Sequence, residues 1–141
     1  MKTTRRDLPA LLPLLAAALP ASAASAAMRS QTWRHEDLTA KGNDEKRSRA
    51  VFDGLSHKDY PIDMHETELA PGMAPHPPHS HAHHELLILR EGTLEVMIEG
   101  KTSTIGPGGV AYVASNENHG WHNVGKTRAS YYVMALGRDR A

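Results

Sequence analysis

The sequence predicts an all-β fold, arranged as a β-barrel or as a jelly roll of antiparallel sheets. Short stretches with alternating apolar residues recur along the second half of the chain, and glycine- and proline-rich turns separate them. No stretch carries the apolar periodicity of a long helix. The chain has one phenylalanine, so aliphatic side chains, methionine and tyrosine must fill the core. A length of 141 residues indicates a single domain.

Residues 1–27 have the pattern of a cleaved secretory signal peptide. A basic start precedes an apolar stretch from 8 to 19, and small residues follow it. This stretch is shorter than the ~20 residues that span a bilayer, so it predicts no stable membrane anchor. Arg5 and Arg6 resemble the twin-arginine export motif; an ordinary leader with adjacent arginines is the alternative. We therefore expect a periplasmic or secreted protein.

The charge balance gives no reason to expect a nucleic acid or an anionic membrane as a partner. Basic and acidic residues both number 16, so the formal net charge is zero. The chain has no cysteine, which excludes disulfide bonds and thiolate metal sites. Any metal must therefore be held by nitrogen and oxygen ligands.

A polar N-terminal arm is expected at 28–59, before a barrel domain at 60–137. Within the arm, the sequence predicts a short helix or turn near 35–38 and a short edge strand at 50–52. The charged run at 41–49 is interpreted as solvated surface.

The barrel domain begins with a predicted strand over 60–69. Tyr60, Ile62 and Met64 alternate with other residues, and this period of two is typical of a half-buried strand. His65 has the opposite parity, so we expect it to face solvent.

Further strands are separated by turns such as Gly106-Pro107-Gly108-Gly109. They are expected at 85–90, 93–99, 102–105, 110–113, 119–124 and 129–136.

A histidine-rich segment from Gly72 to Gly92 is the strongest chemical signal in the chain. It holds His76, His79, His81, His83 and His84, followed by Glu85. Histidine is neutral near pH 7 and is the commonest protein ligand for transition metals. His79, His81 and Glu85 share parity, so a continuous strand would project all of them from one face.

A second segment must complete the coordination sphere, and His119 is the better candidate there. His119, Trp121 and Asn123 share one parity, and the tryptophan indicates that this face is buried. His122 has the other parity, so we expect it at the surface.

The chain resembles the cupin family through two motifs. Gly72…His79-x-His81-x-x-x-Glu85-x6-Gly92 resembles the first motif, and Gly100…Pro107-Gly108-Gly109…His119-x-x-x-Asn123 looks like the second. With the flanking strands, the resemblance covers about 60–136. The chain looks like a small single-domain bacterial cupin and resembles quercetin-dioxygenase-like cupins. The resemblance implies a jelly-roll barrel in which His79, His81, Glu85 and His119 bind one divalent metal.

The ligand set has one alternative. His81 and His83 also satisfy same-face spacing, so this pair stays open. For His76, His83, His84 and His122, a surface or supporting position is the expected one.

The metal is one of Fe, Mn, Ni, Cu or Zn, since all suit imidazole and carboxylate ligands. Four protein ligands leave open positions for a small substrate and O2, or for water. The resemblance implies a dioxygenase-like oxidoreductase acting on a small enol, phenol or diketone, with Glu85 also as the catalytic proton acceptor. A non-enzymatic module that holds a metal or small ligand is the alternative, and isomerase or lyase chemistry is a third. Small cupins commonly pair, so we expect a homodimer.

Overall fold

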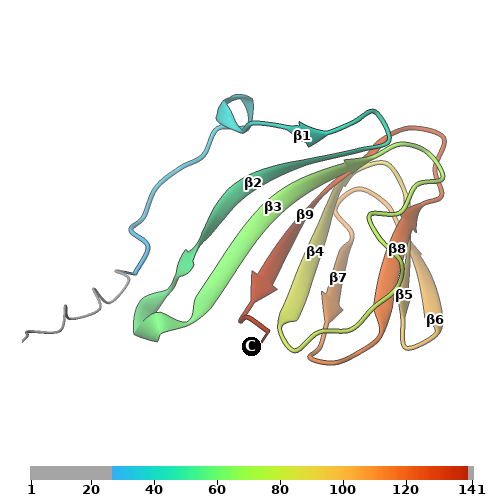
Figure 1. Ribbon diagram of the computed structural model, residues 1–141. Helices are drawn as coiled ribbons and strands as arrows, with labels where there is room; N and C mark the ends of the chain where they lie inside the picture. Colours follow the sequence, from blue (N-terminus) through green and yellow to red (C-terminus); the bar gives the residue numbers. More distant parts are fainter. Residues whose placement is uncertain (1–26, 140–141) are drawn as a thin grey trace, which may run out of the picture.

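The computed structural model describes residues 27–139, so the expected signal peptide lies outside the described residues except for its last position. Two antiparallel sheets face each other and diverge toward β1 and β2 (Figure 1). The larger sheet has the strand order β1-β2-β3-β9-β4-β7, and the smaller sheet has the order β6-β5-β8. This arrangement confirms the predicted all-β jelly roll. No helix among the described residues is long and apolar enough to cross a membrane.

Most strands lie where the alternating pattern predicts them. The elements are η1 (His35–Asp37), β1 (Lys41–Gly42), β2 (Lys46–Leu55), η2 (His57–Asp59), β3 (Pro61–Leu69), β4 (His84–Glu91), β5 (Leu94–Ile98), β6 (Lys101–Ile105), β7 (Val110–Val113), β8 (His119–Asn123) and β9 (Ala129–Leu136). β7 and β9 have their predicted bounds, and every other barrel strand starts and ends within one residue of its predicted limits.

β2 is longer than predicted, with 10 residues in place of a short edge strand at 50–52. It pairs with β3 along its length, apart from one bulge, and β1 takes the edge position. The charged run concealed this strand because Arg49, at its end, is paired across the ladder with acidic residues of β3. Arg49 Nη1 lies 3.1 Å from Glu66 Oε2 and also contacts Glu68. Such cross-strand pairs stabilise a ladder without apolar alternation.

His65 on β3 points into the barrel, so the prediction that it faces solvent is wrong. Thr67 and Leu69 share its parity and are buried, at 3% and 0% exposure. His65 also stands opposite Val133 of β9, which belongs to the core.

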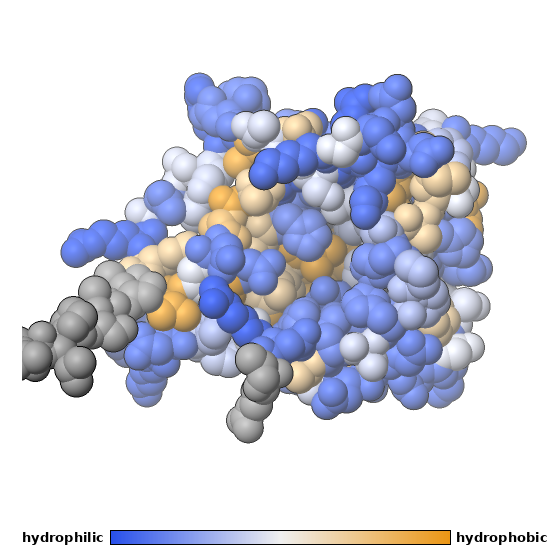
Figure 2. Space-filling view, viewed as in Figure 1, coloured by the Kyte–Doolittle hydropathy of each residue, from blue (hydrophilic) through white to orange (hydrophobic). Residues whose placement is uncertain are grey.

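The outer face of β3 is covered by the N-terminal arm, which explains the error. Met64 stands opposite Phe52 on that face, and Phe52 packs against Trp33 with ring centroids 5.2 Å apart. Apolar residues therefore occur on both faces of β3, and parity alone selected the wrong one. Figure 2 shows hydrophobic side chains over β2 and β3 and in the hollow between the sheets, framed by hydrophilic ones.

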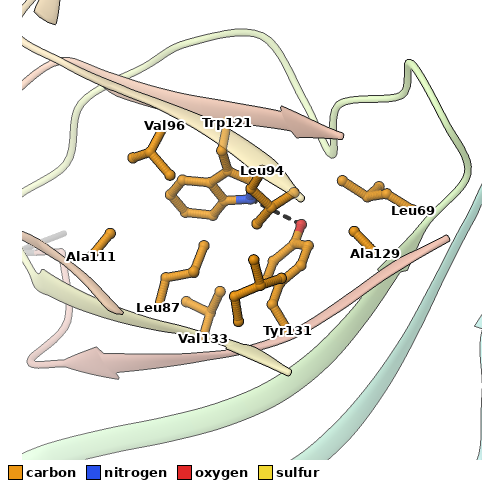
Figure 3. Close-up of a cluster of buried hydrophobic side chains, with 10 residues drawn as sticks. Leu69, Leu87, Leu94, Val96, Ala111, Trp121, Ala129, Tyr131 and Val133 are labelled. Atoms are coloured by element: carbon orange, nitrogen blue, oxygen red, sulfur yellow. Dashed lines mark hydrogen bonds between the residues drawn. The ribbon is translucent and has the colours of Figure 1, made fainter. Parts of the chain in front are cut away.

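Both sheets contribute to a compact apolar core (Figure 3). Leu87 and Tyr131 project from the larger sheet toward Leu94 and Trp121 of the smaller sheet. The indole Nε1 of Trp121 donates a hydrogen bond of 2.9 Å to the Tyr131 hydroxyl. Each large side chain of this kind contributes roughly 1.5–3 kcal/mol by burial. The core therefore holds β4, β8 and β9 in fixed relative positions.

Asn123 anchors the end of β8 although it is polar and fully buried. Its amide nitrogen donates to the carbonyls of Leu69 at 3.0 Å and Thr127 at 2.8 Å. Its oxygen accepts from the backbone N–H of Gly125 at 2.9 Å. A buried amide is tolerated when its donors and acceptor are satisfied in this way. The residue thus ties β8 to β3 and to the turn before β9.

Candidate metal centre

The histidine-rich segment is a loop up to residue 83, so the condition of a continuous strand through His79, His81 and Glu85 is not met. His79 pairs with β8 through an isolated bridge to His119. Its N–H donates to the His119 carbonyl at 3.0 Å, and the reverse bond measures 2.9 Å. This bridge brings the loop against β8.

The loop nevertheless brings the predicted residues together. Ligand atoms of His79, His81 and His119 all lie within 4.8 Å of one another. Glu85 is at the start of β4; its Oε1 lies 3.4 Å from His81 Nε2 and its Oε2 lies 3.3 Å from His119 Nε2. Three imidazoles and one carboxylate therefore converge from the loop, β4 and β8.

Backbone carbonyls fix the orientation of two of these rings. His81 Nδ1 donates to the carbonyl of His83 at 2.9 Å, and His119 Nδ1 donates to the carbonyl of Glu117 at 2.8 Å. A carbonyl only accepts, so each Nδ1 carries the proton and each Nε2 presents a lone pair. Metal-binding histidines are typically oriented by such a bond from the other ring nitrogen.

The polar atoms that face the centre fit a cation. His81 Nε2, His119 Nε2 and Glu85 Oε2 are buried and have no hydrogen-bond partner among the described residues. Buried polar atoms are seldom left without a partner. A divalent transition metal would satisfy all of them at once, and the donor set of imidazole nitrogen and carboxylate oxygen suits Fe, Mn, Ni, Cu or Zn.

His79 is neutral near pH 7, as a metal ligand must be. Burial and the neighbouring His76, His119 and His81 lower the pKa of its imidazole. The ring of His76 packs edge-on against it with centroids 4.3 Å apart. His76 therefore supports a ligand side chain.

His83 lies beside the centre, and the alternative ligand pair of His81 and His83 stays open. His83 stacks on His81 with ring centroids 3.6 Å apart, and its Nε2 lies 3.6 Å from Glu85 Oε1. Its Nδ1 donates to Asp139 at 3.0 Å, and the same carboxylate accepts from the backbone N–H of Ala82 at 2.7 Å. No sequence signal pointed to Asp139, which is more than fifty positions from the loop.

Two of the histidines expected at surface or supporting positions, His84 and His122, lie away from the centre. His122 is half-exposed, with Nδ1 3.9 Å from Glu95, which agrees with its expected surface position. His84 Nδ1 hydrogen-bonds the Tyr112 hydroxyl at 2.8 Å.

A small cavity of about 120 Å³ lies beside the carboxylate of Glu85. Trp121, Tyr131 and Val133 form its apolar wall, and His65 lies on the side formed by β2 and β3. Burial raises the pKa of Tyr131, so its hydroxyl stays protonated. The sequence did not identify His65 as part of this cavity, because it assigned the residue to solvent.

Comparison with solved structures shows the same fold in several proteins. The polyketide cyclase RemF from Streptomyces resistomycificus is 21% identical, with a TM-score of 0.65 over 80% of this chain and 83% of that one. KdgF from a Halomonas species is 15% identical, with a TM-score of 0.66 over 79% and 97%. A predicted oxalate decarboxylase from Thermotoga maritima is 20% identical, with a TM-score of 0.62 over 76% and 99%. No curated protein matches the chain by sequence.

A family model described as a cupin domain matches residues 65–135. That range contains all four residues of the predicted centre and runs from β3 to β9. With the jelly roll and its solved relatives, this match shows that the chain belongs to the cupin domain family.

Proposed function

We propose that this protein is an exported, metal-dependent oxidoreductase of the dioxygenase type that acts on a small enol, phenol or diketone. In this proposal His79, His81, Glu85 and His119 hold one divalent transition metal. The observation that carries it is the convergence of buried, unpartnered nitrogen and oxygen atoms beside a cavity. The leader pattern in 1–27 supports export.

The size of the cavity favours a reactive group no larger than a single ring. Its volume is about 120 Å³. An apolar protein cavity of ~150 Å³ accommodates benzene, whereas sites for drug-sized ligands measure ~300–1,000 Å³. A catechol, an enol or a small diketone meets this limit.

The residues around the cavity support distinct roles. A metal in the centre would supply Lewis acidity and open coordination positions. Trp121 and Val133 exclude water from one wall, which strengthens electrostatic interactions inside. Glu85 borders both the imidazoles and the cavity, which supports a second role as the proton acceptor for a phenol or enol.

The relatives favour an enzyme over a purely binding module. RemF is described as a cyclase, and the Thermotoga protein as a predicted oxalate decarboxylase. The shared fold is compatible with catalysis, although it does not define the reaction.

The experiment is to purify the protein without chelator, measure bound metal by mass spectrometry, and follow O2 uptake with catechols, enols and small diketones. We expect about one metal per chain and O2 consumption with at least one substrate class. Reconstitution with each of the five metals follows. Full metal occupancy with no turnover under any reconstitution would overturn the dioxygenase proposal in favour of a binding module.

Matched histidine variants test the ligand set. His79→Ala and His119→Ala are each expected to abolish stoichiometric metal binding. His122→Ala is the control, because its side chain is 42% exposed and its Nδ1 lies 3.9 Å from Glu95. Full metal occupancy in His119→Ala would show that β8 does not contribute a ligand. His83→Ala tests the alternative pair.

A further inference from the structure

A groove of about 590 Å³ lies between the N-terminal arm and the inner face of β2. The arm and β1 form one side, through Asp37, Leu38, Thr39 and Lys41. Ser48, Ala50 and His65 form the other side. The groove is several times larger than the cavity at the metal centre.

The groove and the metal cavity share a boundary. Ser48 and His65 line both of them, whereas Ala50 lines only the groove and Glu85 only the cavity. In the β2–β3 ladder, Ser48 stands opposite Thr67 and Ala50 stands opposite His65. These side chains are therefore neighbours on one face of the sheet. They form a junction between the outer groove and the inner cavity.

His65 is the side chain at this junction with the most hydrogen-bonding capacity. No described residue hydrogen-bonds its ring, while Ser48 Oγ and Thr67 Oγ1 are bonded to each other at 3.2 Å. Burial lowers the pKa of His65, so its imidazole is neutral near pH 7. A neutral imidazole both donates and accepts, which suits a hydroxyl or carbonyl group passing the junction.

We propose that the substrate is an elongated molecule whose oxygen-chelating head occupies the metal cavity and whose tail lies in the groove. His65 hydrogen-bonds the molecule where the head joins the tail. Leu38 and Ala50 give the groove apolar contacts, and the Asp37 carboxylate is already paired with the guanidinium of Arg34, at 2.7 and 2.8 Å. The tail is therefore uncharged and largely apolar. This inference rests on the metal centre proposed above.

The test compares a head-only probe with a tailed probe. Catechol and 4-phenylcatechol are titrated by calorimetry into the metal-reconstituted full chain. We expect 4-phenylcatechol to bind at least tenfold more tightly than catechol. Ala50 lines the groove but not the cavity, so Ala50→Phe should cut this ratio below about twofold and leave the catechol affinity and the metal content unchanged.

Two further variants sharpen the result. Thr102→Phe, at an exposed position on β6, is the matched control and should keep the tenfold ratio. His65→Leu should weaken both probes about tenfold without loss of metal, and His65→Gln should restore part of that affinity because it keeps hydrogen-bonding groups. A merely structural role would lower the thermal stability of both His65 variants and leave the probe affinities equal to the wild-type values.

The outcomes separate the two proposals. If the wild type binds metal but binds 4-phenylcatechol no more tightly than catechol, the groove proposal is overturned and the metal centre stands. The same conclusion follows if the Ala50→Phe variant keeps the tenfold affinity ratio. A wild type that takes up no metal under any reconstitution overturns the metal centre and the inference with it. If Ala50→Phe lowers the particle mass in light scattering and leaves the probe ratio unchanged, the groove is occupied by a second copy of the chain instead.

Discussion

Glu66 shows how a single residue on the outer face of β3 carries a buried charge. Its side chain is 1% exposed. Oε1 accepts from the Ser130 hydroxyl at 2.8 Å, and Oε2 accepts from His35 Nε2 at 2.8 Å. Arg49 and Arg90 lie 3.1 and 3.2 Å from the carboxylate. A buried carboxylate is tolerated only with this degree of pairing.

This network makes stability depend on pH. Burial alone would raise the pKa of Glu66, but hydrogen bonds from Ser130 and His35 outweigh it and hold the pKa below its usual 4.5. A lowered folded-state pKa adds stability above pH 4.5 that is lost as pH falls through the folded value. Glu66→Gln should therefore cost about 2 kcal/mol of unfolding free energy at pH 7 and less at pH 4.

Urea denaturation at both pH values measures this difference. Glu36→Gln is the control, because Glu36 is 67% exposed and should change stability little at either pH. If Glu66→Gln lowers the unfolding free energy equally at pH 7 and pH 4, the ionisation of Glu66 does not contribute to the stability of the fold.

The sequence identified His79, His81, Glu85 and His119 because the spacing of the two motifs does not depend on whether the residues lie on a strand or in a loop. The structure brings them together through a loop, not through the expected strand. Asp139 lies outside the motifs and meets the loop only after β9 has crossed the sheet. Contacts of that range leave no local pattern in a sequence.

At the scale of elements, the alternation of apolar residues predicts the strands, and the turns between them fix how neighbouring strands pair. The strands after residue 60 follow a period of two because one face is core. β2 was predicted too short because Arg49 pairs with charged residues of β3. β3 was predicted at its observed place, but its inward face was misassigned because both of its faces are covered. Gly92 and Gly100 both adopt positive φ, of 85° and 74°, at the two ends of β5.

These glycines form a matched pair for testing the turns. A Cβ added at Gly92 would lie 2.6 Å from the Ala129 backbone, whereas one added at Gly100 meets nothing within 4 Å. Gly100→Ala should therefore cost only the ~1 kcal/mol of an unfavourable φ. Gly92→Ala should cost about 3 kcal/mol, because β9 must also shift. Equal urea midpoints for Gly92→Ala and Gly100→Ala would show that the close approach of Gly92 to Ala129 contributes nothing to stability.

At the scale of the whole molecule, the arm is built into the larger sheet. β1 and β2 extend that sheet beyond β3, and the groove lies on their inner face. The composition of the arm gave no indication of this, because its polar residues are satisfied by ion pairs instead of by solvent alone. The expected homodimer stays a prediction.

Export is tested with residues 1–141 expressed in a bacterial host. Replacing Arg5 and Arg6 together with lysine preserves the charge of the leader but removes the paired guanidinium groups of the twin-arginine motif. We expect the wild type in the periplasmic fraction and the double variant in the cytoplasm, as measured by fractionation and immunoblotting. Equal periplasmic yields would indicate an ordinary leader that tolerates either basic residue.

The central position of β9 constrains when the protein folds during its synthesis. β9 is the last in sequence of the strands between residues 27 and 139, yet it lies between β3 and β4 and pairs with both. Until residues 129–136 are available, these two strands expose unpaired edges, and the larger sheet exists only as separate pieces. Non-local pairing of this kind is slow. The barrel, and the β4–β8 geometry that the metal centre needs, therefore forms after translation of the domain is complete.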